Sequence, residues 1–170
     1  MATTITKDGV AKMLKAVELL TKRQALIGIP ASSADRGDGG PINNAMIGWI
    51  SEMGSPSNNI PPRPHLVPGI EKAMPEAIDR LKKAGQAALG GKLDQVEAGL
   101  NEVGLICSAS VKTTITNVLE PKLSDATIYR RQHRKVKKAG DPSPHHGTMP
   151  LVDSGAYLQA ITYVVRDKED

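Results

Sequence analysis

The sequence contains almost no aromatic residues. Phenylalanine is absent from its 170 residues, and the only rings of the Trp and Tyr type are those of Trp49, Tyr129, Tyr157 and Tyr163. The core is therefore expected to be aliphatic. The same shortage disfavours the nucleic-acid-binding modules that stack bases on exposed rings, because few rings are available for stacking.

Cysteine and long apolar runs are also scarce. The single cysteine, Cys107, excludes an internal disulfide and a metal site built from several cysteines. Residues 1–7 are polar and lack the apolar stretch of a signal peptide. No apolar run approaches the roughly 18 residues that a membrane helix needs. We therefore expect a chain that folds in a cytoplasm and has no membrane partner.

The charge is mildly basic, with a formal net charge of +4 and a sequence pI near 9.2. This excess is too small to indicate a nucleic-acid-binding protein by itself. With 39% hydrophobic and 24% charged residues, the composition is that of a globular protein. The length fits one domain, so we expect a single domain over residues 1–170.

The spacing of apolar residues predicts three main helices. The first is capped by Asp8 and ends near Arg23, and the second follows Pro68, with Pro75 either starting or kinking it. The third, near residues 92–119, has the most regular apolar stripe: Leu93, Val96, Leu100, Val103, Cys107, Val111, Thr114 and Val118. Because Cys107 lies on this stripe, we expect a core residue rather than a nucleophile.

Short apolar runs predict strands at residues 25–29 and 161–166. Residues 43–53 predict a short helix that passes into a strand. Ser124 or Asp125 is expected to cap a further helix that continues into a basic stretch. The predicted class is therefore α+β, in which a small mixed or antiparallel sheet packs with several helices.

Two long polar loops, residues 31–41 and 139–150, are expected to be mobile. The first contains an Arg-Gly-Asp tripeptide at residues 36–38, which we interpret as turn residues rather than as an adhesion motif. The second contains His145 and His146, whose adjacent spacing does not suit metal ligands on one helix face. Because the motifs for phosphate binding and hydrolysis are absent, we expect no metal site and no cofactor. A hydrolase that uses these two histidines is the least favoured alternative.

The stretch from residue 130 to 138 is dense in cations: Arg130, Arg131, Arg134, Lys135, Lys137 and Lys138. We interpret it first as a solvated helix end or a surface that contacts an acidic partner. The alternative is a nucleic-acid-binding accessory protein in which these side chains contact phosphates.

The segment from Glu52 to Ile70 contains five prolines and two glycines between parts that read as regular structure. Proline fixes φ and restricts the residue before it, so this segment is expected to hold one shape. Glu52 and Arg63 border its stiffest part. Either a turn between them brings their charges together, or they are two unrelated surface groups.

Several short motifs then recur in an order that resembles the tail-completion and neck proteins of long-tailed bacteriophages. The motifs are ALIGIP at residues 25–30, IGWISEMGS at 47–55, IPPRPHLVP at 60–68, LSDATIYRR at 123–131 and PLVDSGAYLQAITYVV at 150–165. The resemblance spans about residues 8–166. In two places, His65 and Met53, this chain departs from the Phe that members of the family usually carry.

The resemblance implies a small α+β structural protein of the virion without enzymatic activity. Such a protein forms a ring, here expected to be a hexamer, at the head-proximal end of the tail or the neck. Its partners would be copies of itself, the tail tube or tail terminator and the head-completion or connector proteins, with DNA passing through the channel. It would be found in the host cytoplasm during assembly. The two polar loops would then be arms that order on docking.

A ring closes only if each subunit holds its interface angle, and a rigid segment loses little entropy on docking. We therefore expect the proline segment, with a short stretch near the C-terminal motif, to form the interface. The residues that we assign to it are Glu52, Gly54, Pro61, Pro62, Arg63, Pro64, Leu66, Pro68, Asp153 and Gly155.

Overall fold

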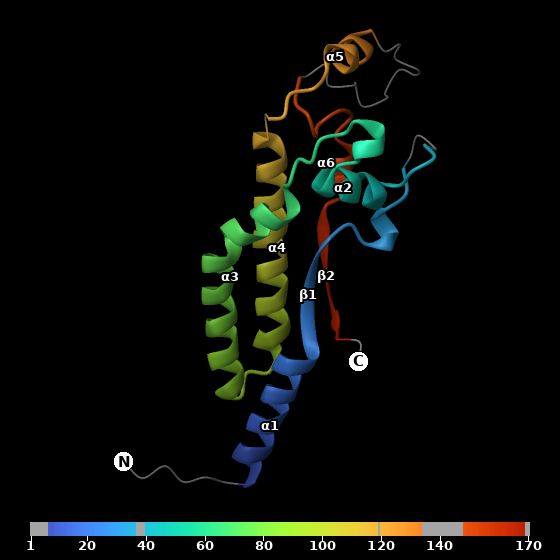
Figure 1. Cartoon of the computed structure of the whole chain (residues 1–170). Coiled ribbons are helices and arrows are strands. Elements are labelled where there is room, and N and C mark those ends of the chain that lie inside the picture. Colours follow the sequence, from blue (N-terminus) through green and yellow to red (C-terminus); the bar gives the residue numbers. More distant parts are fainter. Residues whose placement is uncertain (1–6, 37–39, 119, 134–147, 169–170) are drawn as a thin grey trace.

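The structure, a computed structural model, describes residues 7–36, 40–118, 120–133 and 148–168. Its elements, with two 3-10 turns (η), follow the order α1 (Lys7–Lys22), β1 (Arg23–Gly28), η1 (Ala31–Ser33), α2 (Asn44–Met53), η2 (Pro56–Asn58), α3 (Leu66–Leu89), α4 (Asp94–Asn117), α5 (Asp125–Gln132), α6 (Ala156–Ala160) and β2 (Thr162–Asp167). The predicted α+β class is confirmed. The molecule is elongated, with α1 at one end and α2, α5 and α6 gathered at the other (Figure 1).

The helical hairpin of α3 and α4 forms the body of the molecule (Figure 1). On α3, the side that packs against the rest of the chain consists of small residues: Gly69, Ala73, Ala77, Ala84 and Ala88. Small side chains let two helix backbones come close together. At Gly69, a Cβ would lie 2.7 Å from the Cα of Val111 on α4, so this contact requires glycine.

The sheet has two antiparallel strands, β1 and β2, taken from opposite ends of the sequence. Their register pairs Ala25 with Val165 and Ile27 with Tyr163. Side chains of both pairs pack among the apolar clusters of α3 and α4 or onto α4. The pair between them, Leu26 and Val164, is 41% and 38% exposed, so the outer face of the sheet is open.

The core is aliphatic, as the sequence predicts. The largest fully buried apolar side chains in the described part of the chain are Ile115, Ile161, Val111 and Cys107. Cys107 is 1% exposed, and burial raises the pKa of its thiol. The predicted stripe on the long helix is confirmed for most members, but Ile115 is buried in place of Thr114, which is half-buried.

Several local predictions are corrected by the structure. Residues 44–53 are helical throughout, because Asn43 caps α2 by accepting a hydrogen bond from Met46 N, and no strand follows. Of the two alternatives for Pro75, the start of the helix is wrong, because Pro75 lies inside α3, where it is exposed. The structure begins α1 at Lys7, one residue before Asp8, the predicted cap. Residues 37–39 and 139–147, which belong to the two polar loops, lie outside the described residues.

We predict that Gly104→Ala destabilises the protein although alanine favours helices. Gly104 lies inside α4, directly under the ring of Tyr163 from β2, and a Cβ there would overlap that ring. Overpacking costs about 1–3 kcal/mol, which exceeds the helix gain of about 1 kcal/mol. Urea denaturation measures the change in the free energy of unfolding. The matched control is Gly85→Ala on α3, where the nearest atoms would be 3.9 Å away and stability should rise. If Gly104→Ala were as stabilising as Gly85→Ala, the tight contact would be refuted.

Candidate functional site

Three of the motifs quoted above meet at the end of the molecule that carries α2 and α6. Glu52 comes from α2, His65 from the proline segment just before α3, and Tyr157 from α6. The α2 and α6 helices lie side by side there (Figure 1). Segments about 90 residues apart in sequence are thus joined by one polar cluster, with His65 and Tyr157 separated by 92 positions.

The carboxylate of Glu52 caps the N-terminus of α3. It accepts hydrogen bonds from the backbone N–H groups of His65 (2.8 Å), Leu66 (3.0 Å) and Val67 (3.1 Å). The first N–H groups of a helix have no partner within the helix, and the helix dipole favours negative charge there. Because α3 has no side-chain cap of its own, Glu52 supplies one from another helix.

His65 is fully buried, with 0% of its surface exposed. Its Nδ1 lies 2.8 Å from the carbonyl oxygen of Arg63 and 3.2 Å from Glu52 Oε2, so Nδ1 carries the ring proton and donates it. Its Nε2 then accepts a hydrogen bond from the hydroxyl of Tyr157. Each ring nitrogen of this residue, which has no access to solvent, thus has a hydrogen-bond partner within the fold.

The cluster shifts the pKa of both acidic groups. Burial alone would raise the pKa of Glu52, but the N–H donors of His65, Leu66 and Val67 outweigh it and lower the pKa below its ordinary 4.5. Burial, together with the charge of Glu52, raises the pKa of the Tyr157 hydroxyl. The tyrosine therefore stays a hydrogen-bond donor across the physiological range. Catalytic sites can also contain a carboxylate, an imidazole and a hydroxyl that contact one another in that order. Here, however, the imidazole of His65 is fully buried.

The predicted pairing of Arg63 with Glu52 is wrong. Arg63 is 9% exposed, and its guanidinium points inward and donates to the carbonyl oxygens of Pro121 (2.9 Å) and Lys122 (3.1 Å). Its own backbone N–H donates to Ser51 O at 2.7 Å. Arg63 thus fastens the proline segment to the chain that follows α4, and a charge-assisted hydrogen bond of this kind contributes roughly 1.5–3 kcal/mol.

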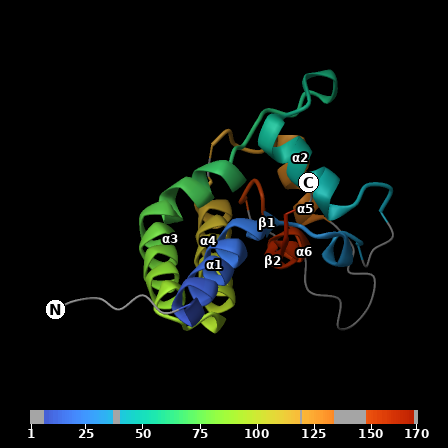
Figure 2. The ribbon, with the colours of Figure 1, turned by 90° about the horizontal axis from the view of Figure 1, so that it is seen from below.

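The proline segment is held from inside and presents its prolines outward. Arg63 and His65 are buried, whereas the prolines that alternate with them are exposed: Pro61, Pro62, Pro64 and Pro68. Gly54 ends α2 at φ +78°, and a Cβ there would lie 2.9 Å from Pro62 N, so both its conformation and its space require glycine. Beyond it, a bridge between Ser55 and Ile60 closes a turn that projects from the body (Figure 2).

Next to this segment, α2 presents an apolar outer face. Met46, Trp49 and Met53 follow the i, i+3, i+7 spacing of one helix face and are 50%, 63% and 57% exposed. Trp and Met are enriched in the cores of protein interfaces. The sequence does not reveal this exposed face, since spacing alone does not say which face of a short helix is covered.

The predicted basic surface is smaller than expected. Arg131 is 8% exposed, and its Nη1 donates to Met149 O (2.7 Å) and Val152 O (2.9 Å). It is therefore not a surface cation but fastens α5 to the C-terminal motif, where it also lies 3.7 Å from Asp153. Arg130 is exposed. The other predicted cations, Arg134, Lys135, Lys137 and Lys138, and the pair His145 and His146 lie outside the described residues.

Of the remaining residues assigned to the interface, Leu66 is half-buried at the start of α3. Asp153 is tied to Arg131, and Gly155 adopts φ +82° directly before α6. Both hold the C-terminal motif in place and are partly covered. Of the residues assigned to the interface, only the four prolines are thus exposed.

No metal or membrane site is found in the part of the chain that the structure describes. There, no three His, Cys, Asp or Glu side chains are placed to hold a metal ion. None of the described helices has the length and apolar character needed to cross a bilayer.

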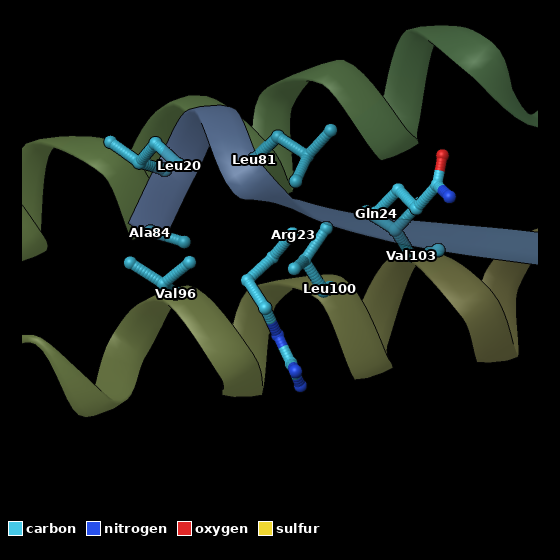
Figure 3. Close-up of a pocket in the computed structure, with 9 residues that line it drawn as sticks. Leu20, Arg23, Gln24, Leu81, Ala84, Val96, Leu100 and Val103 are labelled. Carbon is cyan, nitrogen blue, oxygen red and sulfur yellow. The ribbon is translucent and has the colours of Figure 1, made fainter. Parts of the chain in front are cut away.

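A hollow of about 270 Å³ lies between α1, β1, α3 and α4 and is lined mainly by aliphatic side chains (Figure 3).

Comparison with known proteins gives no relative from which a role could be transferred. The chain matches no family model, and no curated protein or solved structure is significantly similar to it.

We predict that the cap by Glu52 makes the free energy of unfolding depend on pH in the acid range. Glu52→Gln should lower the free energy of unfolding at neutral pH by roughly 1–3 kcal/mol, because three N–H groups lose a charged acceptor. Since the folded pKa of Glu52 is lowered, its stabilisation is present above about pH 4.5 and is lost as the pH falls through the folded value. The difference between the parent and the variant should therefore shrink below pH 4.5 in urea denaturation.

Glu71→Gln is the matched control, because Glu71 is an exposed carboxylate in the early turns of the same helix. A Glu71→Gln effect equal to that of Glu52→Gln, or a Glu52 effect that does not change with pH, would contradict the cap.

Proposed function

We propose that this chain is a structural protein of a tailed-phage virion, a tail-completion or neck component that forms a ring and continues the DNA channel between tail and head. The proposal starts from the motif resemblance. It is supported by one structural observation above others, namely that three of the five motifs carrying the resemblance converge on a single polar cluster. The cluster fixes the proline segment, which is otherwise exposed.

A segment fixed in this way suits repeated assembly. Its five prolines are all exposed and have little conformational freedom to lose. The buried side chains of Arg63 and His65, on either side of Pro64, prevent the segment from turning over. A contact made by preorganised groups keeps more of its interaction energy as affinity. In a closed ring, each copy must also present the contact at the same angle.

The outer face of α2 adds the apolar anchor that such a contact needs. Trp49 is the most exposed of its three large side chains and lies between Met46 and Met53 along the helix. Binding energy in protein interfaces is concentrated in a few residues, and Trp is the most typical of them. We assign the α2 face and the outward prolines to the same interface, whose partner is a neighbouring copy or another ring of the neck.

In this account, the remaining partners would be the tail tube or terminator and the head-completion or connector proteins. DNA would pass the inner surface of the ring. The protein would act without a cofactor and without catalysis, in the host cytoplasm during assembly and at the neck in the virion.

We predict that Pro61→Gly with Pro64→Gly weakens assembly and leaves the fold intact. Both prolines are exposed, so the folded subunit loses no buried contact, and the unfolded chain gains freedom worth about 0.4–1 kcal/mol at each position. Mass photometry over a concentration series, with and without purified phage tail tubes, measures the fraction in discrete rings. The expected result is rings for the parent and mainly monomers for the double variant at the same concentration.

Pro75→Ala serves as the control, because it removes an exposed proline from α3 and leaves the segment unchanged. Trp49→Ser provides a second, independent test of the same interface. If the parent forms no ring at any concentration or on tubes, the proposed function is refuted. If both interface variants form rings as well as the parent does, the assigned surface is wrong.

A further inference from the structure

The sheet has an open edge at β1. Lys168 N donates to Lys22 O, so in this antiparallel pair the backbone groups of Gln24, Leu26 and Gly28 face β2. Those of Ala25 and Ile27 point the other way and have no hydrogen-bond partner among the described residues. An unpaired strand edge is a template for another strand, and folded proteins normally cover it.

An uncovered apolar surface runs beside this edge. On α3, Leu81 marks the flank that faces the sheet, because it lines the same hollow as β1, whereas Arg80 on the opposite flank pairs with Glu102 of α4 (3.8 Å). Three side chains lie on the Leu81 flank at helical spacing and are 54%, 43% and 55% exposed: Val67, Met74 and Ile78. The two strands of the sheet do not cover these three side chains.

The hollow continues the same surface. Figure 3 shows β1 crossing between α3 and α4, with Leu81 on the α3 side and Leu100 on the α4 side of the hollow. An added strand would find backbone partners on β1 and an apolar floor on α3. Strand addition uses these two components, with main-chain bonds for affinity and alternate side chains in apolar depressions for specificity.

The layer below the edge restricts what can occupy it. In this protein β2 lies on α4, so a second copy that added its β2 to the edge would also add its α4 underneath. The space under the edge is already filled by α3, and the two helices would collide. The site therefore fits a single extended segment with no helix under it.

We propose that residues 3–6 of a second copy occupy this edge. The sequence there is Thr-Thr-Ile-Thr, four β-branched residues without charge, which suits a strand over an uncharged apolar floor. These residues lie outside the described part of the chain and join it at Lys7, the first residue of α1.

The reach of the segment selects a second copy. Four extended residues span at most about 14 Å, whereas the 16 residues of α1 span about 24 Å and separate Lys7 from the first residue of β1. Residues 3–6 therefore cannot lie along the β1 edge of their own chain. Exchange between copies would link each subunit to the next and, if the rotation closes, complete a ring. This inference rests on the proposed self-assembly and adds a contact to it.

The test uses two single-cysteine variants, each in a Cys107→Ala background that removes the native thiol. One carries Ile5→Cys and the other Ile78→Cys, and they are mixed at a concentration where mass photometry shows oligomers. Because each chain holds one thiol, a disulfide between positions 5 and 78 can join only two copies. Mass spectrometry of the oxidised mixture identifies the linked peptides. We expect the 5–78 peptide in the oligomer.

The matched control replaces Ile78→Cys with Glu76→Cys, which is exposed on α3 but lies away from the Leu81 flank. A 5–76 yield equal to the 5–78 yield, or oligomers without the 5–78 peptide, would overturn the exchange while leaving ring formation intact. A mixture that remains monomeric at every concentration, without a cross-link, would refute self-assembly itself and the exchange with it.

Discussion

The arrangement of one end of this protein depends on a helix cap that comes from another helix. Glu52 on α2 supplies the acceptor for the first N–H groups of α3. The cap fixes where α3 begins, and therefore where the chain before it must run. That chain is the proline segment, which gains two further attachments through the buried side chains of Arg63 and His65. Without the carboxylate, α3 would start with unpaired donors in a partly buried place, which is costly.

The rest of the molecule acts as a scaffold for this end. Small residues let α3 and α4 pack closely, and the sheet lies on α4 through Tyr163 and Gly104. Because β2 follows α6 directly, the sheet also fixes Tyr157 relative to α3. The helix α1 and the helices α2 and α6, which carry the polar cluster, thus lie at opposite ends of the hairpin (Figure 1). An elongated subunit with different surfaces at its two ends is suited to contacts that are not self-complementary.

The class and most elements could be predicted from the sequence. The stripe on α4 has helical period over several turns, and the run that forms β2 alternates, so periodicity identifies both. The run that forms β1 is continuously apolar, and its short length and the proline after it indicate a strand. The cluster could not be predicted in this way. His65 stands in a proline-rich segment without an apolar period, so the sequence indicates neither its burial nor its partner. Its partner Tyr157 lies 92 residues away, and only tertiary packing brings the two together.

Charged residues were the least predictable. Arg63 and Arg131 read as surface cations because arginine is seldom fully buried. Each is buried here because backbone carbonyl groups of a distant turn accept its hydrogen bonds, and no local pattern encodes such a turn. The same limitation hid the exposed face of α2, since a short amphipathic helix does not reveal which side is covered.

The most direct test of the central claim is amide hydrogen exchange at His65, Leu66 and Val67, followed by NMR. An ordinary exposed helix start exchanges these protons quickly, because nothing within the helix accepts them. If the carboxylate of Glu52 caps α3, the three amides should be protected to the level of the α3 interior at neutral pH, and that protection should be lost in Glu52→Gln. Rapid exchange at all three amides in the parent protein would show that the cap does not hold and that the proline segment is not fixed by it.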